Sequence, residues 1–317
     1  MKKLPKKYIV VLGAINLDIV TKVPRIPKEN ETVISEGLKF IPGGKATNAA
    51  VTMSRLEGNA ILLGKIGDDS FGKEVKKLLN GDGINTDFID IDSFSPTGTV
   101  IVSVNHKGKN TIIVNENANI RITKDHISDF LRKVDRNLIK VDLFYTTLEP
   151  LLEIIEFAIT EFNKRNIPIF CDAAPQARPL PENFYRHIDF LSSNEYEMSA
   201  MTGINVTDVE TAEYAAKQLV KKGANNIIVT LGKLGAIYLK KNSTKSTYFP
   251  GNKVKAIDET AAGDAFRGAF VVEYLKTRDL HKSMEFANRA GAFATTKLGT
   301  YNAMPTRKEL DFLEILK

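Results

Sequence analysis

The chain of 317 residues carries 44 Lys and Arg against 38 Asp and Glu, a formal net charge of +6, and a single cysteine. One cysteine excludes a disulfide within the chain, which suits a reducing compartment, and we expect the protein in the cytoplasm. The apolar run 8–12 behind the N-terminal lysines is too short for a signal peptide, and we expect no membrane span. Because the lysines are spread along the chain without interleaved aromatics, we expect a solvated basic surface and no nucleic-acid partner.

Residues 8–13 form an apolar run that ends in a glycine, and they predict a buried strand. Behind this run, Asn16 and Asp18 have the same parity, so their side chains share one face of an extended segment. Two polar groups placed in this way can bind adjacent hydroxyls of a sugar. A turn Asn beside a capping Asp would give the same spacing.

A helix is predicted over 45–57, stopped by a glycine and followed by a strand at 60–63. Four residues at the helix start can approach or hold a ligand: Gly43, Gly44, Lys45 and Asn48. This start is not a Walker phosphate-binding loop, because Ala46 stands where that loop has its metal-binding Ser or Thr. A further helix is predicted from Ser70, a suitable cap.

Residues 97–104 and 110–114 are β-rich and flank a short polar turn, a pattern typical of a hairpin. Residues 14–41 also alternate loosely. These pieces interrupt an α/β pattern, so we assign about 14–41 and 97–117 to a small sheet beside the main one.

Strands and helices then alternate through the middle of the chain at 141–146, 151–164, 167–171, 188–191, 209–221, 226–230 and 236–240. This order predicts an α/β fold with an open, mostly parallel sheet and helices on both faces. No change of composition marks a linker, so we expect one domain over 1–317. Thr306 begins a capping box before a final helix.

Residues 258–268 predict a small-residue turn that enters a helix. Ala261, Ala262 and Gly263 are small, and backbone N–H groups at such a helix start can bind a phosphate. Asp264 lies beside them, where its carboxylate could accept a proton from an attacking hydroxyl. Asp is also favoured in the first turn of a helix as a cap.

The segments 258–268 and 43–50 closely resemble the two signatures of the ribokinase-like (PfkB) family of sugar kinases, and the features between them follow in the family's order. The resemblance covers roughly residues 8–316. It implies that the small sheet is a lid over the sugar, that Asp264 is the catalytic base, and that the amides of 261–264 stabilise the transferred phosphoryl group.

The resemblance also implies the binding residues. The sugar would be held by Asn16, Asp18, Gly43, Gly44, Lys45, Asn48 and Glu149 under an apolar ceiling of Val100 and Val102. The nucleotide would meet Asn194, Thr230, Gly232, Gly235, Gly263 and Asn288. Glu149 could instead be a carboxylate at the start of the following helix. Ribokinases usually have Gly where this chain has Ala46, which predicts a tighter sugar pocket.

Two cations are implied. Glu197 would hold Mg²⁺ through water, since Mg²⁺ loses its hydration shell reluctantly. A monovalent cation would lie among Asp258, Thr260 and the carbonyls of Ala294, Lys297 and Gly299. Ribokinase has a hydroxyl-bearing residue where this chain has Ala303, so dependence on K⁺ is left open.

The resemblance therefore implies an ATP- and Mg²⁺-dependent kinase, with the C5 hydroxyl of D-ribose as the expected acceptor and a homodimer formed through the lid. A nucleoside kinase for cytidine, adenosine or inosine is the alternative within the family. Val100 is bulkier than the residue usual in ribokinases, and a close ceiling disfavours a base on C1. A sugar sensor without activity is the alternative from another class, and ADP as donor stays open.

Overall fold

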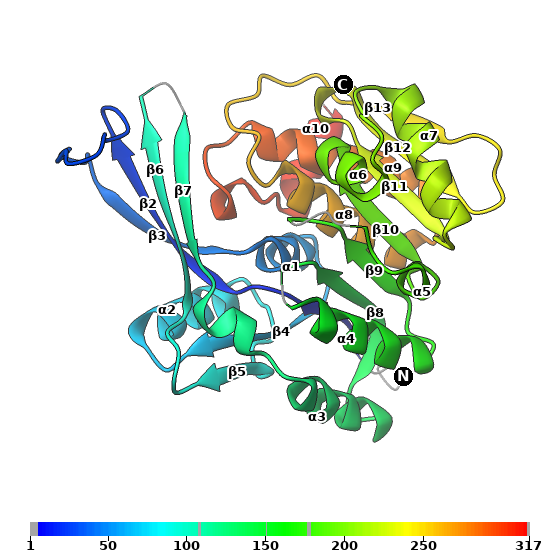
Figure 1. Ribbon diagram of the computed structural model, residues 1–317, viewed down its shortest axis with the longest axis horizontal. Coiled ribbons are helices and arrows are strands. Elements are labelled where there is room, and N and C mark those ends of the chain that lie inside the picture. Colours follow the sequence, from blue (N-terminus) through cyan, green and yellow to red (C-terminus); the bar gives the residue numbers. More distant parts are fainter. Residues whose placement is uncertain (1–5, 107–108, 150, 176–178, 316–317) are drawn as a thin grey trace.

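The computed structural model describes residues 6–106, 109–149, 151–175 and 179–315, which fold into two β-sheets with helices packed on the larger one (Figure 1). Lys107 and Gly108 of the predicted hairpin turn, and Pro150, lie outside the described residues.

The larger sheet has nine described strands in the order β13-β12-β11-β10-β9-β8-β1-β4-β5. Neighbours are parallel, except that β12 runs antiparallel to both β11 and β13. The strands are β1 (Lys7–Leu12), β4 (Ala60–Gly67), β5 (Ile89–Asp92), β8 (Lys140–Thr147), β9 (Ile169–Asp172), β10 (Phe190–Asn194), β11 (Asn226–Thr230), β12 (Gly235–Lys240) and β13 (Thr247–Pro250). The predicted open, mostly parallel sheet is confirmed.

Helices cover both faces of this sheet, because alternate residues of its central strands point to opposite sides and both sides are buried. Val11 belongs to the core on one side, with α1 (Lys45–Arg55), α2 (Ser70–Gly81), α8 (Ala262–Thr277), α9 (Leu280–Thr295) and α10 (Arg307–Ile315). Val10 belongs to the core on the other side, with α3 (Lys124–Asp135), α4 (Leu152–Lys164), α5 (Glu182–Tyr185), α6 (Glu195–Thr202) and α7 (Val209–Lys221). The apolar runs in the sequence reflect this double burial.

The smaller sheet has four strands in the order β3-β2-β6-β7 and stands beside the larger one (Figure 1). The strands β2 (Asn16–Val23), β3 (Leu38–Gly43), β6 (Gly98–Asn105) and β7 (Asn110–Asn115) come from the two segments predicted for it. The antiparallel pair β6 and β7 is the predicted hairpin. Asp18 on β2 lies opposite Val100 on β6, so both side chains share one face.

Two helix starts differ in how well local sequence predicts them. α2 is capped by Asp69 and not by Ser70, because Asp69 accepts a backbone N–H of the first turn at 2.7 Å. Asp69 also accepts the N–H and the hydroxyl of Thr97, so the same carboxylate joins the helix to the residue before β6. α10 begins with the predicted capping box, in which Thr306 and Glu309 exchange hydrogen bonds.

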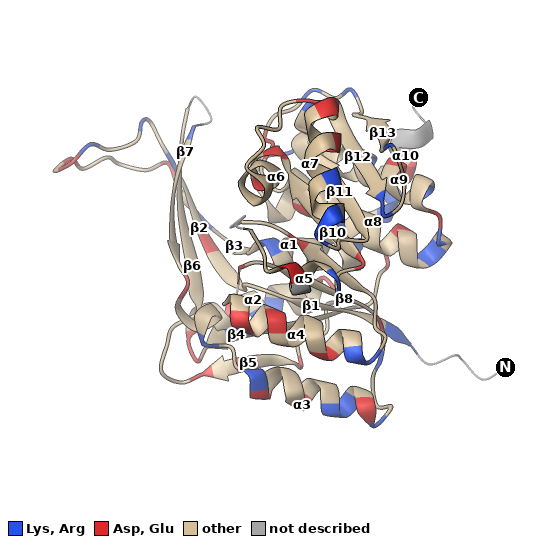
Figure 2. Ribbon diagram, turned by 45° about the vertical axis from the view of Figure 1, so that its right-hand side comes forward, with Lys and Arg blue, Asp and Glu red and all other residues tan. Residues whose placement is uncertain are grey.

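Lys and Arg are distributed over several helices, and the strands of the smaller sheet carry few charged side chains (Figure 2). No helix among the described residues combines the length and the apolar character that crossing a membrane requires.

Candidate active site

The central parallel strands end together at one edge of the larger sheet, where ligands gather in open α/β folds. Three register pairs place the strand ends level: Leu12 with Thr146, Thr147 with Asp172, and Asn194 with Thr230. Arg267 of α8 contacts Asp172 at one of these ends, and Thr47 of α1 donates to the carbonyl of Ala14 just after β1, so this edge is the candidate site.

The turn into α8 has the features of an anion-binding site. Ala261 precedes the helix with φ 62° and ψ 8°, a left-handed conformation that costs a residue with a Cβ roughly 1–2 kcal/mol. The first helical hydrogen bond runs from Ala265 N to the Ala261 carbonyl at 3.0 Å. Ala262 N–H donates to a loop carbonyl before the helix at 3.3 Å. With the Ala262 N–H engaged, the amides of Gly263 and Asp264 in the first turn of α8 are well placed to bind the phosphoryl group.

Asp264 is 4% exposed, and its carboxylate accepts a hydrogen bond from Asn48 Nδ2 at 2.9 Å. Burial raises the pKa of Asp264, while the charge of Lys45 and the Asn48 bond act in the opposite direction. The Asp264 charge in turn is the main cause that raises the pKa of Lys45. A buried carboxylate beside an anion site is suited to accept a proton there.

Close packing of α1 against α8 brings these groups together. A Cβ added at Gly268 would lie 2.7 Å from the Cβ of Thr52 and 2.8 Å from the Ala49 carbonyl. Any side chain at this position would push α8, and with it Asp264, away from α1.

Asn16 and Asp18 lie on β2, and only 5% and 8% of them is exposed. Asn119 donates to Asn16 Oδ1 at 2.7 Å and accepts the N–H of Ile15 at 2.8 Å, so it orients the Asn16 amide. The predicted shared face of Asn16 and Asp18 is present.

Two buried acceptors at this site, Asp18 Oδ1 and Asn48 Oδ1, have no hydrogen-bond partner within the described structure. Glycines make the close approach of the neighbouring chain possible. A Cβ at Gly43 would lie 2.0 Å from Asp18 Oδ1, and one at Gly98 would lie 2.3 Å from Asn16 Oδ1. Unpartnered buried acceptors are costly, and hydroxyl donors of a ligand would satisfy them.

Glu149 lies at the start of α1 and does not cap α4. Its carboxylate accepts from Lys45 N at 3.1 Å and from Ala14 N at 3.4 Å. Gly44, the N-cap residue of α1, has no side chain to do this. Burial raises the pKa of Glu149 to about 7 against these bonds. Burial, followed by the charge of Glu149, also raises the pKa of Asp18 to about 7.

The expected narrowing of the sugar pocket by Ala46 is wrong. Ala46 is fully buried, and its Cβ would be 2.2 Å from a Cβ at Gly13. The extra methyl group therefore packs between α1 and the turn after β1, where Gly13 leaves room for it.

Val100 and Val102 are half-buried on β6, on the face that carries Asp18. Their partners on β7, Val114 and Ile112, are 57% and 51% exposed and extend the same apolar row. The structure therefore places an apolar surface next to the polar pair on β2.

Asn194 and Glu197 form a capping box at the start of α6. Glu197 N donates to Asn194 Oδ1, and Asn194 N donates to Glu197 Oε2, each at 2.8 Å. Glu197 is 4% exposed at the edge of the site. No three His, Cys, Asp or Glu side chains of the described ranges cluster as metal ligands. One carboxylate fits Mg²⁺ nonetheless, because this ion is commonly held by one or two carboxylates and substrate phosphates.

The loop after β11 carries three predicted nucleotide contacts. Thr230 ends the strand, and its hydroxyl donates to the Ser193 carbonyl at 3.3 Å. Gly232 and Gly235 have φ values of 50° and 105°. A Cβ at Gly235 would lie 2.1 Å from the Phe249 carbonyl, so this glycine is needed for packing as well.

Asn288 lies on α9 and is 8% exposed. Its Nδ2 donates to the carbonyls of Phe249 and Pro250 at 3.2 and 3.3 Å. It lines a cavity of about 630 Å³ together with His281 and Glu285 of the same helix. The side-chain amide thus holds α9 to the end of β13.

The segments predicted to bind a monovalent cation lie together. Asp258 accepts from the hydroxyl of Thr260 at 2.6 Å and from Gly299 N at 2.9 Å. Lys297 N donates to the Ala294 carbonyl at 3.3 Å, which leaves that oxygen partly engaged.

Three polar residues next to the predicted site residues were not predicted from the sequence. Asn119 orients Asn16, and Asp172 at the end of β9 pairs with Arg267 of α8 at 3.1 Å. Asp172 directly follows a predicted strand, and Arg267 lies within the 258–268 segment, so both could have been considered.

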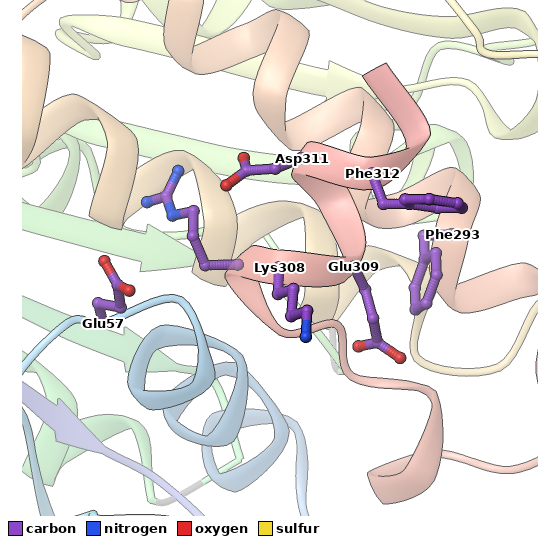
Figure 3. Close-up of a pocket in the computed structure, with 7 residues that line it drawn as sticks. Glu57, Phe293, Lys308, Glu309, Asp311 and Phe312 are labelled. Carbon is purple, nitrogen blue, oxygen red and sulfur yellow. The ribbon is translucent and has the colours of Figure 1, made fainter. Parts of the chain in front are cut away.

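A second cavity of about 600 Å³ lies between α10 and the end of α1, lined by Glu57, Phe293 and Phe312 among others (Figure 3). It contains none of the predicted site residues.

The model of the pfkB family carbohydrate kinases matches residues 6–307. Over 98% of its length the chain is 33% identical to a ribokinase of Haemophilus influenzae, of which it covers 99%. It is 32% identical to a deoxyribokinase of Salmonella typhi, with 96% of the chain and 97% of the relative covered. The structure of Arabidopsis thaliana ribokinase complexed with ribose and ATP superposes with a TM-score of 0.87 at 27% identity, covering 99% of both chains.

We predict that Asp18→Asn stabilises the unliganded protein at pH 8 by roughly 1–3 kcal/mol, since one pKa unit corresponds to about 1.4 kcal/mol. The raised pKa means that the folded state binds the proton more tightly. Stability should therefore fall as pH rises from about 4 to about 7 and then level off. The amide side chain of the variant does not titrate, so the contribution of position 18 to this loss of stability disappears. The contribution of Glu149, whose pKa is also raised, remains. Urea unfolding at pH 5 and pH 8 measures both effects.

Asp87→Asn, at an exposed position, is the control and should change little. If the Asp18→Asn protein is no more stable than the wild type at pH 8, the Asp18 charge does not destabilise the unliganded protein, and the prediction is wrong.

Proposed function

Because the chain belongs to the pfkB family of carbohydrate kinases, we propose that it transfers the γ-phosphoryl group of ATP to the C5 hydroxyl of D-ribose. Family membership makes the protein a sugar or nucleoside kinase that phosphorylates a hydroxyl group, and the choice of ribose is the finer step. The observation that carries this choice is the pair of unpartnered buried acceptors, Asp18 Oδ1 and Asn48 Oδ1.

A polyhydroxylated acceptor suits these atoms. Each ribose hydroxyl is a donor as well as an acceptor, so hydroxyls can satisfy Asp18 and Asn48 while the oriented Asn16 amide donates to another. Gly43 leaves room for the Asp18 carboxylate and Gly44 for the carbonyl of Ala14, and Lys45 and Glu149 are proposed to lie at the edge of the sugar.

In the proposed reaction the acceptor oxygen attacks the γ-phosphorus, and the bond to the ADP oxygen breaks. The hydroxyl proton passes to the Asp264 carboxylate. The N–H groups of Gly263 and Asp264 stabilise the charge on the transferred group, with Ala261 and Ala262 shaping the turn, and the positive end of the α8 dipole adds to this. Lys45 keeps a positive charge beside the same point.

The nucleotide is proposed to lie along Asn194, Thr230, Gly232, Gly235 and Gly263, with Asn288 near the base. Glu197 would hold Mg²⁺ through water, and the ion would neutralise charge on the phosphates. For a monovalent cation, Asp258, Thr260, Ala294, Lys297 and Gly299 remain the proposed set.

The smaller sheet is proposed to act as a lid of one kinase domain that spans 1–317, in the cytoplasm. Val100 and Val102 would close over the sugar, and their bulk leaves little room for a base. This favours ribose over cytidine, adenosine or inosine. Deoxyribose is the second candidate, because a deoxyribokinase matches at nearly the same identity as a ribokinase.

We also propose a homodimer formed through the lid. On the face opposite Asp18, large apolar side chains are exposed: Leu38 at 55%, Phe40 at 46%, Ile101 at 39% and Ile113 at 56%. Such a surface is typical of a contact between subunits. Sedimentation velocity should give twice the chain mass of 35.1 kDa.

Ile113→Glu should then produce the monomer, whereas Ile91→Glu, on β5 of the larger sheet and 54% exposed, should remain dimeric. A wild-type protein that sediments as a monomer would contradict the homodimer. An Ile113→Glu variant that remains dimeric would contradict a dimer formed through the lid.

An acceptor panel tests the proposed substrate. We expect kcat/KM for D-ribose to exceed that for cytidine, adenosine and inosine by tenfold or more, about 1.4 kcal/mol of transition-state preference. Deoxyribose and fructose complete the panel, each acceptor is assayed with ATP and with ADP, and both series are run with and without K⁺. A nucleoside that exceeds ribose tenfold would replace the ribose assignment. Binding of ribose without any turnover would establish the sensor instead.

A further inference from the structure

Arg267 is a buried guanidinium for which the proposed reaction gives no role. It is 3% exposed on α8, three residues after Asp264, so both side chains lie on the same side of the helix. Its Nε lies 3.1 Å from Asp172 Oδ1 and 3.1 Å from Ser192 Oγ. Its Nη2 donates to Glu197 Oε2 at 3.3 Å.

The contact with Glu197 fixes the orientation of a carboxylate. Glu197 Oε2 accepts both the Arg267 bond and the N–H of Asn194 at 2.8 Å. Two donors on one oxygen restrain rotation of the group, and the other oxygen, Oε1, would then be the one available to hold Mg²⁺ through water. The capping box alone would hold Oε2 by a single hydrogen bond.

The other edge of the guanidinium lies against the anion-binding turn. A Cβ added at Gly263 would lie 2.7 Å from Arg267 Nη1, which places this nitrogen directly behind the glycine. One planar cation therefore lies next to the turn and is hydrogen-bonded to Glu197. Arg can do this because its donors point in several fixed directions.

We infer that Arg267 is a positioning residue that orients Glu197 toward Mg²⁺ and adds positive charge behind the anion-binding turn. This inference rests on the proposed function. The competing role is structural: Arg267 would only balance the buried Asp172, since removing one partner of a buried ion pair leaves an uncompensated charge.

The double variant Arg267→Gln with Asp172→Asn separates the two roles, because it removes both charges of that pair together. We expect it to fold but to melt below the wild-type temperature, because Glu197 also loses its buried partner. In calorimetric titrations its affinity for ADP with Mg²⁺ should fall at least tenfold. Its affinity for ADP in EDTA should change less than threefold, because the metal is then absent and the anion turn receives the transferred group rather than ADP. Its kcat should also fall at least tenfold.

Asp172→Asn alone is the matched control and should stay within threefold of the wild type in all three measurements, since the pair of Arg267 and Glu197 remains. Arg267→Lys, which keeps the charge but loses the forked donors, is the second variant should the double variant not fold. It should weaken binding of ADP with Mg²⁺ at least threefold.

A folded double variant that binds ADP with Mg²⁺ as the wild type does would overturn the inference and leave Arg267 as the partner of Asp172. The wild type itself tests the proposed function separately. If Mg²⁺ does not strengthen its binding of ADP, the nucleotide and metal assignment fails, whatever the variants do.

Discussion

The site depends on a carboxylate held where its charge is disfavoured. Asp264 is buried at the start of α8, and burial raises its pKa. The Lys45 charge and the Asn48 hydrogen bond lower the pKa of Asp264 against this effect, and the positive end of the helix dipole also favours the ionised carboxylate. The first two require α1 and α8 to pack closely, which Gly268 permits. The fold therefore places the proposed proton acceptor and the proposed anion-binding turn within one helical turn of each other.

The buried carboxylates in the two halves of the site differ in whether a positive charge compensates them. Where we propose the sugar, Asp18 and Glu149 lie close to each other, both have a pKa raised to about 7, and Asp18 Oδ1 has no partner in the described structure. Where we propose the nucleotide, Glu197 is paired with Arg267. The first half thus carries an electrostatic cost that bound hydroxyls would relieve, whereas the carboxylate of the second half is already compensated. A stability cost at a binding surface is common in enzymes.

Sequence reasoning predicted what depends on local pattern. The apolar runs predicted the strands, and the parity of Asn16 and Asp18 predicted their shared face. It could not predict contacts between distant segments. Glu149 caps α1 from 104 residues away, which no local pattern reveals. The left-handed Ala261 and the pairing of Asp172 with Arg267 also depend on tertiary packing. Ala46 was misjudged because its neighbour, Gly13, follows a different strand.

The most direct test of the central claim is turnover by Asp264→Asn. The amide keeps the shape of the side chain, and its oxygen can still accept the Asn48 hydrogen bond. Ribose and nucleotide should therefore bind within threefold of the wild type, as calorimetry would measure. Loss of a general base lowers kcat by about 10²–10⁴-fold. A fall in kcat of less than about tenfold, with binding intact, would contradict the assignment of Asp264 as the proton acceptor.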